Sequence, residues 1–251
     1  MTRTDLSGAD LSGSVLPGND LTTVLMDSNT RFIGANMTGV LLRGQDMRGV
    51  DLSDTDLTGA DMRQIIVDAT TILRGAILAG VNLGGTDLSG VELDEADLTG
   101  ATLDDEEAGS ATLSGASLAG AILTGADLSY TDLVGINFAG AILDSADMSW
   151  SDLTDADLHD ASLIGVNLDN AVMEAANLNN ANLETASMRG SQLGCCNGSG
   201  ALLDDCIPAR FRGTLFKEVD LSPAPNGTLT DLCQTDLRGN VMEGANISGH
   251  E

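Results

Sequence analysis

Aromatic residues and lysine are nearly absent from this chain. Only 2% of its 251 residues are aromatic, and its single lysine, Lys217, stands beside ten arginines. With 38 acidic residues, the formal net charge is −27. A globular core of this length normally contains more rings, so the plentiful Leu, Ala, Ile, Val and Met indicate a narrow core of small and medium side chains. The negative charge disfavours direct binding to nucleic-acid phosphates.

Long apolar runs and targeting segments are also missing. No run approaches the roughly 18 residues needed to span a bilayer, and nothing resembles a signal peptide. We therefore expect a cytoplasmic protein that does not contact a membrane. Four cysteines lie near the C-terminus without CxxC or CxxH spacing, so reduced thiols, a disulfide and a metal site all stay open, and no metal ligand is predicted. They are Cys195, Cys196, Cys206 and Cys233.

No catalytic constellation appears in the sequence. The two histidines, His159 and His250, have no Ser or Cys that the spacing would hold beside them. The glycines recur every five residues and do not form GxGxxG before a helix. We therefore predict no enzyme activity, no catalytic residues and no cofactor.

The chain does have a repeat of five residues. From Ala76 it reads AILAG VNLGG TDLSG VELDE ADLTG ATLDD, and after one irregular five it resumes with ATLSG. A period of five fits neither the helical 3.6 nor the strand alternation of 2, so the chain must turn once per repeat. Glycines at the repeat ends favour turns with positive φ. Such self-similarity predicts a solenoid in which each unit packs against its neighbours.

Small interruptions divide the repeat. One extra residue after Met26 and another within 64–71 shift its phase, and we interpret both as bulges that leave the stack continuous. Residues 1–193 are predicted to form the regular solenoid. Residues 194–251 are predicted to continue it irregularly, with two loops at 194–210 and 222–230, and loops on a rigid scaffold often carry function.

The repeated Ala-Asp/Asn-Leu-x-x unit resembles the motif of the pentapeptide-repeat family over nearly the whole chain. The resemblance implies an all-β fold, a right-handed quadrilateral β-helix of about twelve coils with four repeats per coil. It also implies that the central residue and the small residue two before it point inward. Residues twenty apart would then lie above each other at the ~4.8 Å spacing of paired strands.

Acidic residues are distributed unevenly. About half of them stand directly before a central residue, where the motif takes Asp or Asn, and a hydrogen bond to local backbone explains them. Between Arg74 and Arg189, however, there are twenty acids and no Lys or Arg. Stacking every twenty residues predicts one column of Asp87, Glu107, Asp127 and Asp147, with Asp132 above Asp152 in the next. Carboxylates ~5 Å apart in water repel by just under ~1 kcal/mol per pair. Such columns suit a basic partner, and a high-salt habitat or simple solubility is the alternative explanation.

Tyr130 and Trp150 are the only Tyr and Trp, twenty residues apart at the last position of their repeats. They should stack on the outside beside the acidic columns, where an aromatic pair is a candidate contact spot. The alternative is that the two rings merely cover each other on a solvated face. The predicted partner-binding residues are Asp87, Glu107, Asp127, Tyr130, Asp132, Asp147, Trp150 and Asp152.

These features predict a non-enzymatic protein-binding or scaffold solenoid that presents an acidic face to a basic partner. One alternative comes from the resemblance, because some family members mimic DNA and modulate DNA gyrase or topoisomerase IV. This chain departs from those members in having few central Phe residues and no amphipathic C-terminal helix. A purely structural rod is the third hypothesis. No capping element is evident at the solenoid ends, so we expect either an end-to-end homodimer or capping by the irregular C-terminal loops.

Overall fold

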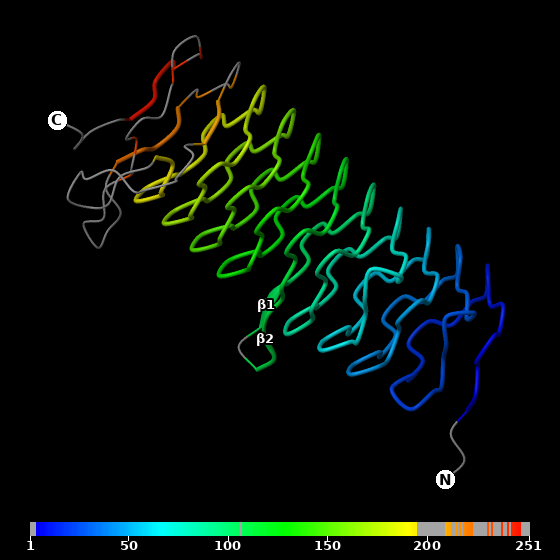
Figure 1. The fold of residues 1–251 in the computed structure, drawn as a ribbon. Coiled ribbons are helices and arrows are strands. Elements are labelled where there is room, and N and C mark those ends of the chain that lie inside the picture. The colour runs from blue at the N-terminus through cyan, green and yellow to red at the C-terminus, as the bar shows by residue number, and fades with distance from the viewer. Residues whose placement is uncertain are drawn as a thin grey trace.

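The chain winds into a rod of stacked coils (Figure 1). The computed structural model describes residues 4–105, 107–194, 209–211, 214, 216, 218–222, 230, 232, 237, 240 and 242–246. Within these residues there is no helix, and hence none able to cross a membrane. The named strands are β1 (Asp104–Asp105) and β2 (Gly109–Ser110), an antiparallel hairpin that projects from the side of the rod. The predicted all-β class is confirmed.

Four ladders of parallel bridges give the coil its four sides. Each bridge joins the residue before one central residue to its counterpart one coil later. We number the sides by one set of bridges: Asp132↔Asp152 on the first side, Asn137↔Asp157 on the second, Ile142↔Ser162 on the third and Asp147↔Asn167 on the fourth. One repeat therefore makes one side, and residues twenty apart in this region lie above each other.

The backbone of a repeat is satisfied almost entirely by neighbouring coils. The repeat Ala96–Gly100 is typical: the amide of Asp97 donates to the coil before, and the amides of Leu98 and Gly100 donate to the coil after. The remaining interior amide, that of Thr99, donates to the Asp97 side chain at 2.9 Å. The Asp or Asn before each central residue is thus an acceptor for a backbone group that the ladders do not reach.

Each corner is a tight turn. At the corner after Leu78, the amide of Val81 donates to the Leu78 carbonyl at 3.1 Å, and Gly80 lies between them with φ 63°. Positive φ at this position marks a type II turn and favours glycine. That requirement explains why glycine recurs at the repeat ends.

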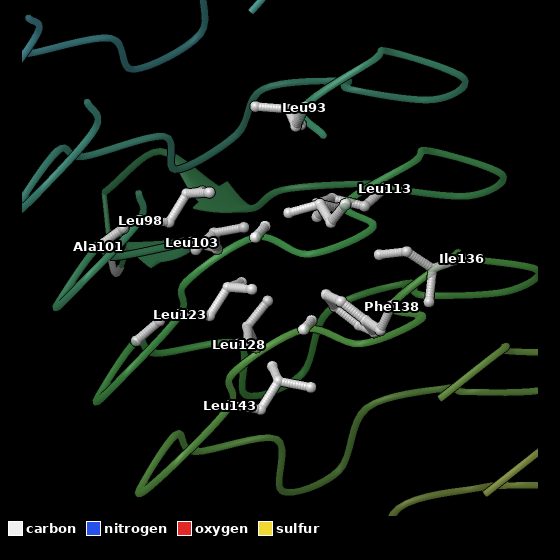
Figure 2. Packing of buried hydrophobic residues seen from close by; sticks show 14 of the residues in the cluster. Leu93, Leu98, Ala101, Leu103, Leu113, Leu123, Leu128, Ile136, Phe138 and Leu143 are labelled. Carbon is white, nitrogen blue, oxygen red and sulfur yellow. The ribbon is translucent and has the colours of Figure 1, made fainter. Parts of the chain in front are cut away.

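The core is a narrow column of stacked layers (Figure 2). The central residues Leu118, Leu123 and Leu133 have no exposed surface, and the small residue Ala101 is 1% exposed. At several positions where a hydroxyl replaces the small residue, it donates to a carbonyl of the core, as Thr55 Oγ1 does to Phe32 O at 2.7 Å. The predicted inward orientation of both positions is confirmed.

The two one-residue insertions are confirmed. Asp5 bridges Leu25, twenty residues on, whereas Asp10 bridges Arg31, twenty-one residues on. The same change occurs again where Asp51 bridges Ile72. In both places the ladders continue beyond the insertion, because the corner turn absorbs the extra residue.

The β1–β2 hairpin is a larger insertion that changes the expected columns. It lengthens its coil to twenty-five residues, so that Asp87 bridges Thr112 and Thr102 bridges Asp127. The predicted column of Asp87, Glu107, Asp127 and Asp147 is therefore wrong. The irregular five residues are an excursion from a corner, and counting by twenty had treated them as one side of the coil.

In the observed arrangement Asp87 belongs to the first side, in the same ladder as Asp132 and Asp152. Asp127 and Asp147 share the fourth side. The predicted stacking of Asp132 and Asp152 is confirmed. Asp87 is separated from Asp132 by Thr112, so no continuous carboxylate column runs along either side.

The ladders reappear near the C-terminus. Arg210 bridges Asn177, and Ala209 N donates to Leu193 O at 2.9 Å, so the described chain resumes its place beside Leu193. Asp220 likewise bridges Ser187. Most of the predicted loops 194–210 and 222–230 lies outside the described residues, as do all four cysteines. The division at residue 193 therefore stays a prediction.

Candidate functional site

The corner between the fourth and first sides carries an aromatic pair. The rings of Tyr130 and Trp150 are parallel to within 2°, with centroids 6.1 Å apart. Tyr130 is 60% exposed and Trp150 49% exposed. The predicted outward stacking is confirmed, and each ring still presents much of its surface to solvent.

Four aspartates flank this pair. Tyr130 stands between Asp127 and Asp132 in the sequence, and Trp150 stands between Asp147 and Asp152 in the next coil. We call these six residues the aromatic edge. The structure thus brings together six of the eight predicted contact residues. The other two predicted residues lie elsewhere. Asp87 is exposed on the first side, two coils before Asp132, and Glu107 lies on the hairpin.

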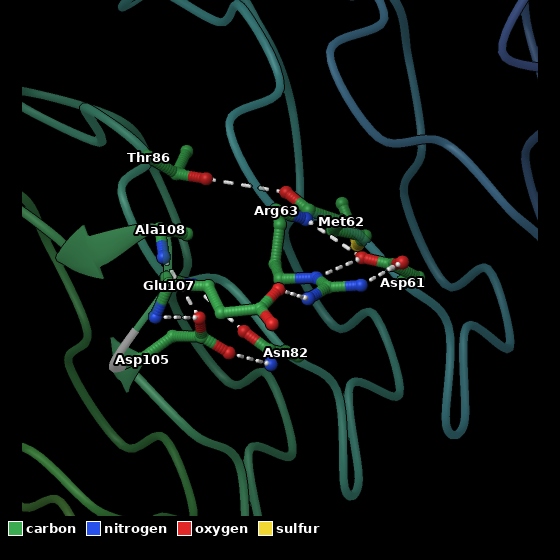
Figure 3. A network of polar contacts seen from close by, with 9 residues as sticks. Asp61, Met62, Arg63, Asn82, Thr86, Asp105, Glu107 and Ala108 are labelled. Carbon is green, nitrogen blue, oxygen red and sulfur yellow. Dashed lines mark hydrogen bonds and ion pairs between the residues drawn. The ribbon is translucent and has the colours of Figure 1, made fainter.

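The hairpin leans toward the earlier coils (Figure 3). Glu107 Oε2 is 3.7 Å from Arg63 Nη1, and the amide of Gly85 donates to Gly109 O at 2.7 Å. A Cβ on Gly84 would lie 2.3 Å from the Asp105 Cβ. Glycine at position 84 therefore provides the space in which the hairpin docks, and Glu107 is directed to a cation of its own chain.

Asp105 fixes the hairpin tip. Its carboxylate accepts from Asn82 Nδ2 at 2.7 Å and from the amides of Ala108 at 2.8 Å and Glu107 at 2.9 Å (Figure 3). The Asn82 hydrogen bond, followed by the Ala108 amide, lowers the pKa of Asp105 below its usual value. The carboxylate is thus used internally and holds the hairpin against the preceding coil.

Arginines neutralise acids in the first third of the rod. Arg63 pairs with Asp61 at 2.7 Å, and Arg48 pairs with Asp46 at 2.7 Å. The Arg63 side-chain hydrogen bond lowers the pKa of Asp61, and the same bond raises that of Arg63. In the described part of the chain, no ion pair of this kind reaches the aspartates of the aromatic edge.

Several acids that sequence reasoning left unexplained are structural. Asp144 Oδ1 accepts from Ser162 Oγ at 2.6 Å and from Ile164 N at 3.1 Å, both in the following coil. In the same way, Asp94 accepts hydrogen bonds from Ser117 Oγ and Ala119 N. Asp169 accepts hydrogen bonds from Ser187 Oγ and Arg189 N. The sequence feature that could have revealed this role is a serine directly before the central residue of the following coil, where the motif expects Asp or Asn. An aspartate from the coil below then supplies the missing acceptor.

The described residues offer no catalytic or metal-binding arrangement. His159 Nδ1 lies 2.8 Å from the Asp157 carboxylate on the surface of the second side. No group of three or more His, Cys, Asp or Glu within the described ranges could hold a metal ion. The aromatic edge is the candidate site, because it joins two exposed rings to four aspartates.

The family follows from comparison with known families. A model for pentapeptide repeats matches in eight copies at residues 28–64, 73–105, 109–138, 121–160 and 151–190, more than half of the chain. The chain belongs to the pentapeptide repeat family. The matched ranges include both coils of the aromatic edge.

Solved structures similar to this pentapeptide repeat protein include several relatives. HetL, a pentapeptide repeat protein from the cyanobacterium Nostoc that is involved in the regulation of heterocyst differentiation, is 25% identical, with 98% of this chain and 88% of HetL covered and a TM-score of 0.31. Rfr23 from the cyanobacterium Cyanothece is 26% identical over 62% of this chain and 89% of Rfr23, with a TM-score of 0.29. The fluoroquinolone resistance protein QnrB1 is 16% identical over 97% of this chain and 92% of QnrB1, with a TM-score of 0.35. The search of curated proteins found no match.

Proposed function

We propose that this pentapeptide repeat protein is a non-enzymatic binding scaffold that presents an acidic face to a basic protein partner. The observation that carries the proposal is the charge of the middle coils. Between Arg74 and Arg189 there are twenty acids and no Lys or Arg. Several corners of these coils hold acids that face solvent, among them Asp155 and Asp160, whereas Glu95 pairs with Arg74 at 3.0 Å and Glu107 lies 3.7 Å from Arg63.

The way in which the acids are held supports binding. Carboxylates before the central residues are fixed by local amides, as Asp152 is by Thr154 N at 3.0 Å and Thr154 Oγ1 at 2.6 Å. A rigid backbone ladder beneath them keeps their spacing constant. Fixed charges lose little conformational freedom when a partner binds, so the acidic face is preorganised.

Partner capture tests this proposal. Wild-type protein and a variant with Asp87, Asp97, Asp132 and Asp152 changed to Asn would be used as baits, with captured proteins identified by mass spectrometry. Asn keeps the Oδ1 acceptor and therefore the fold, which circular dichroism would verify. We expect the wild type to retain proteins with basic surfaces, with retention falling as salt is raised. Equal capture by both baits at all salt concentrations would contradict the proposal.

DNA mimicry directed at DNA gyrase or topoisomerase IV is the second candidate function. It rests on the overall negative charge of a narrow rod. Neutral residues interrupt the acids in every ladder, as in Asp87↔Thr112 and Asp97↔Ile122, which makes the spacing of carboxylates coarser than that of phosphates. A supercoiling assay separates the candidates. Inhibition of gyrase, or protection from a quinolone, at stoichiometric protein would favour mimicry.

A purely structural rod would show neither effect. We also propose that the rod winds right-handedly through about twelve coils. We propose a cytoplasmic location and no direct contact with nucleic acid or membrane. End-to-end pairing of two copies is proposed because Leu6, Leu11 and Leu16 are only partly buried in the first described coil. A mass independent of concentration in solution scattering would argue against that pairing.

A further inference from the structure

The aromatic edge combines features that do not favour folding. Tyr130 has φ 56° and Trp150 has φ 61°, and in other coils the corresponding corner holds Gly85 at 64°, Gly190 at 68°, Gln64 at 55° and Asn170 at 60°. Non-glycine residues are uncommon in this left-handed region, yet eleven others among the described residues adopt it at corners of this chain, so the backbone conformation does not single out the two rings. Glycine would satisfy the turn without strain. Within the described residues, however, Tyr130 and Trp150 are the only exposed Phe, Tyr or Trp side chains, and the turn itself does not require a ring.

The flanking aspartates are unusual in the same way. Among the isolated bridges between described residues, only two join an acid directly to an acid. These are Asp127↔Asp147 and Asp132↔Asp152, one on each side of the aromatic pair. Elsewhere an acid faces a neutral or cationic residue. Like charges at this spacing repel, and both repelling pairs occur at the corner that carries the exposed rings.

The hydrogen bonds of these carboxylates leave one oxygen of each available. Oδ1 of Asp127 and of Asp152 accepts from a backbone amide and a hydroxyl in its own repeat. Oδ1 of Asp132 and of Asp147 accepts from an amide of its own repeat and from a side chain of a neighbouring coil. Within the described ranges, every hydrogen bond to the four carboxylates reaches Oδ1. The four Oδ2 atoms are free to accept from a partner.

We propose that the aromatic edge binds an arginine side chain from an exposed segment of a basic partner protein. The planar guanidinium stacks on an aromatic face and donates in fixed directions to carboxylates at its edge. Stacked rings with carboxylates on both sides match these two requirements together. A lysine ammonium lacks the plane and the fork and fits less well. This inference deepens the proposed acidic-face function and rests on it.

Trp150 makes the test direct, because it is the only tryptophan in the chain and its fluorescence reports on the site. Wild-type protein would be titrated at low ionic strength with the peptide acetyl-Gly-Arg-Gly-Arg-Gly-amide and with the same peptide carrying lysines. We expect a saturable change in Trp150 emission with the arginine peptide and about fivefold weaker binding of the lysine peptide. Equal affinities for the two peptides would overturn the assignment of arginine.

Charge variants test the location of binding. Asp132→Asn with Asp152→Asn should weaken the arginine peptide about tenfold, because two charged acceptors beside the rings are lost. The matched control, Asp87→Asn with Asp97→Asn, removes the same charge at acids whose bridge partners are neutral, and should change the affinity less than about twofold. Equal weakening by both pairs would mean diffuse attraction to the acidic face. The proposed function would then stand and the arginine site would be wrong.

Trp150→Gly tests the ring. This variant places at the corner the residue that positive φ favours, so the fold is retained, and anisotropy of a fluorescein-labelled arginine peptide replaces the lost emission. We expect about a three- to fivefold loss of affinity. Unchanged affinity in Trp150→Gly would refute the role of the ring. Failure of the wild type to bind either peptide at low salt would instead contradict both the arginine site and the acidic-face function.

Discussion

Removing the Asp144 side chain should loosen one corner of the third side. Its Oδ1 accepts from Ser162 Oγ at 2.6 Å and Ile164 N at 3.1 Å in the following coil. At about 1 kcal/mol for each net hydrogen bond, Asp144→Ala should cost about 2 kcal/mol. Ile164 is 36% exposed, and water can replace part of its bond, so the local effect should lie between about 1 and 2 kcal/mol.

Hydrogen exchange at the Ile164 amide is the appropriate measurement. Repeat arrays can open locally, so a global unfolding curve would dilute the effect. A loss of 1 to 2 kcal/mol predicts exchange faster by roughly 5- to 30-fold at Ile164. Amides several coils away should keep their protection.

Two controls separate the hydrogen bond from the charge. Asp144→Asn keeps an oxygen acceptor and should retain most of the protection at Ile164. Asp155→Asn removes a charge from an exposed corner and should leave Ile164 unaffected. The reasoning fails if Ile164 exchanges at the wild-type rate in Asp144→Ala, or if the Asn variant exchanges as fast as the Ala variant.

Three further predictions concern the core, the hairpin and the response to acid. Leu123→Ala should lower the free energy of unfolding in urea by about 2–5 kcal/mol, because Leu123 is fully buried. The control Ile122→Ala should lower it much less, because Ile122 is 37% exposed. Similar losses in the two variants would contradict the inward orientation of Leu123. Gly84→Ala should displace the hairpin, because its Cβ would lie 2.3 Å from the Asp105 Cβ. Hydrogen exchange should then accelerate at the Ala108 amide, and unchanged protection there would rule out this docking. Hydrogen bonds from Ser89 lower the folded pKa of Asp87 below 3.8, and those from Asn82 and Ala108 do the same for Asp105. This stabilisation is complete above about pH 4 and is lost as pH falls through the lowered folded values. Circular dichroism should show acid unfolding below that range, and a fold that gains stability down to pH 2 would contradict it.

Much of the fold could be predicted because the repeat is local. A residue such as Leu118 is identified as central by its neighbours alone, and glycine at position 80 marks a corner because glycine adopts its φ of 63° without steric cost. The insertions after Met26 and near residue 66 were also visible in the sequence, since one residue changes the phase of everything that follows. The stacking of Tyr130 on Trp150 followed from their separation of one regular coil.

The sequence by itself therefore determined the solenoid, its buried positions and its charge. Tertiary structure alone decided which coil lies on which after the hairpin, because the length of an excursion from a corner carries no periodic signal. Because of this stacking, Asp87 lies in the same ladder as Asp132, and Glu107 lies beside Arg63. It also gave Asp144 its role, since hydrogen bonds between coils join residues that are twenty positions apart and share no local motif.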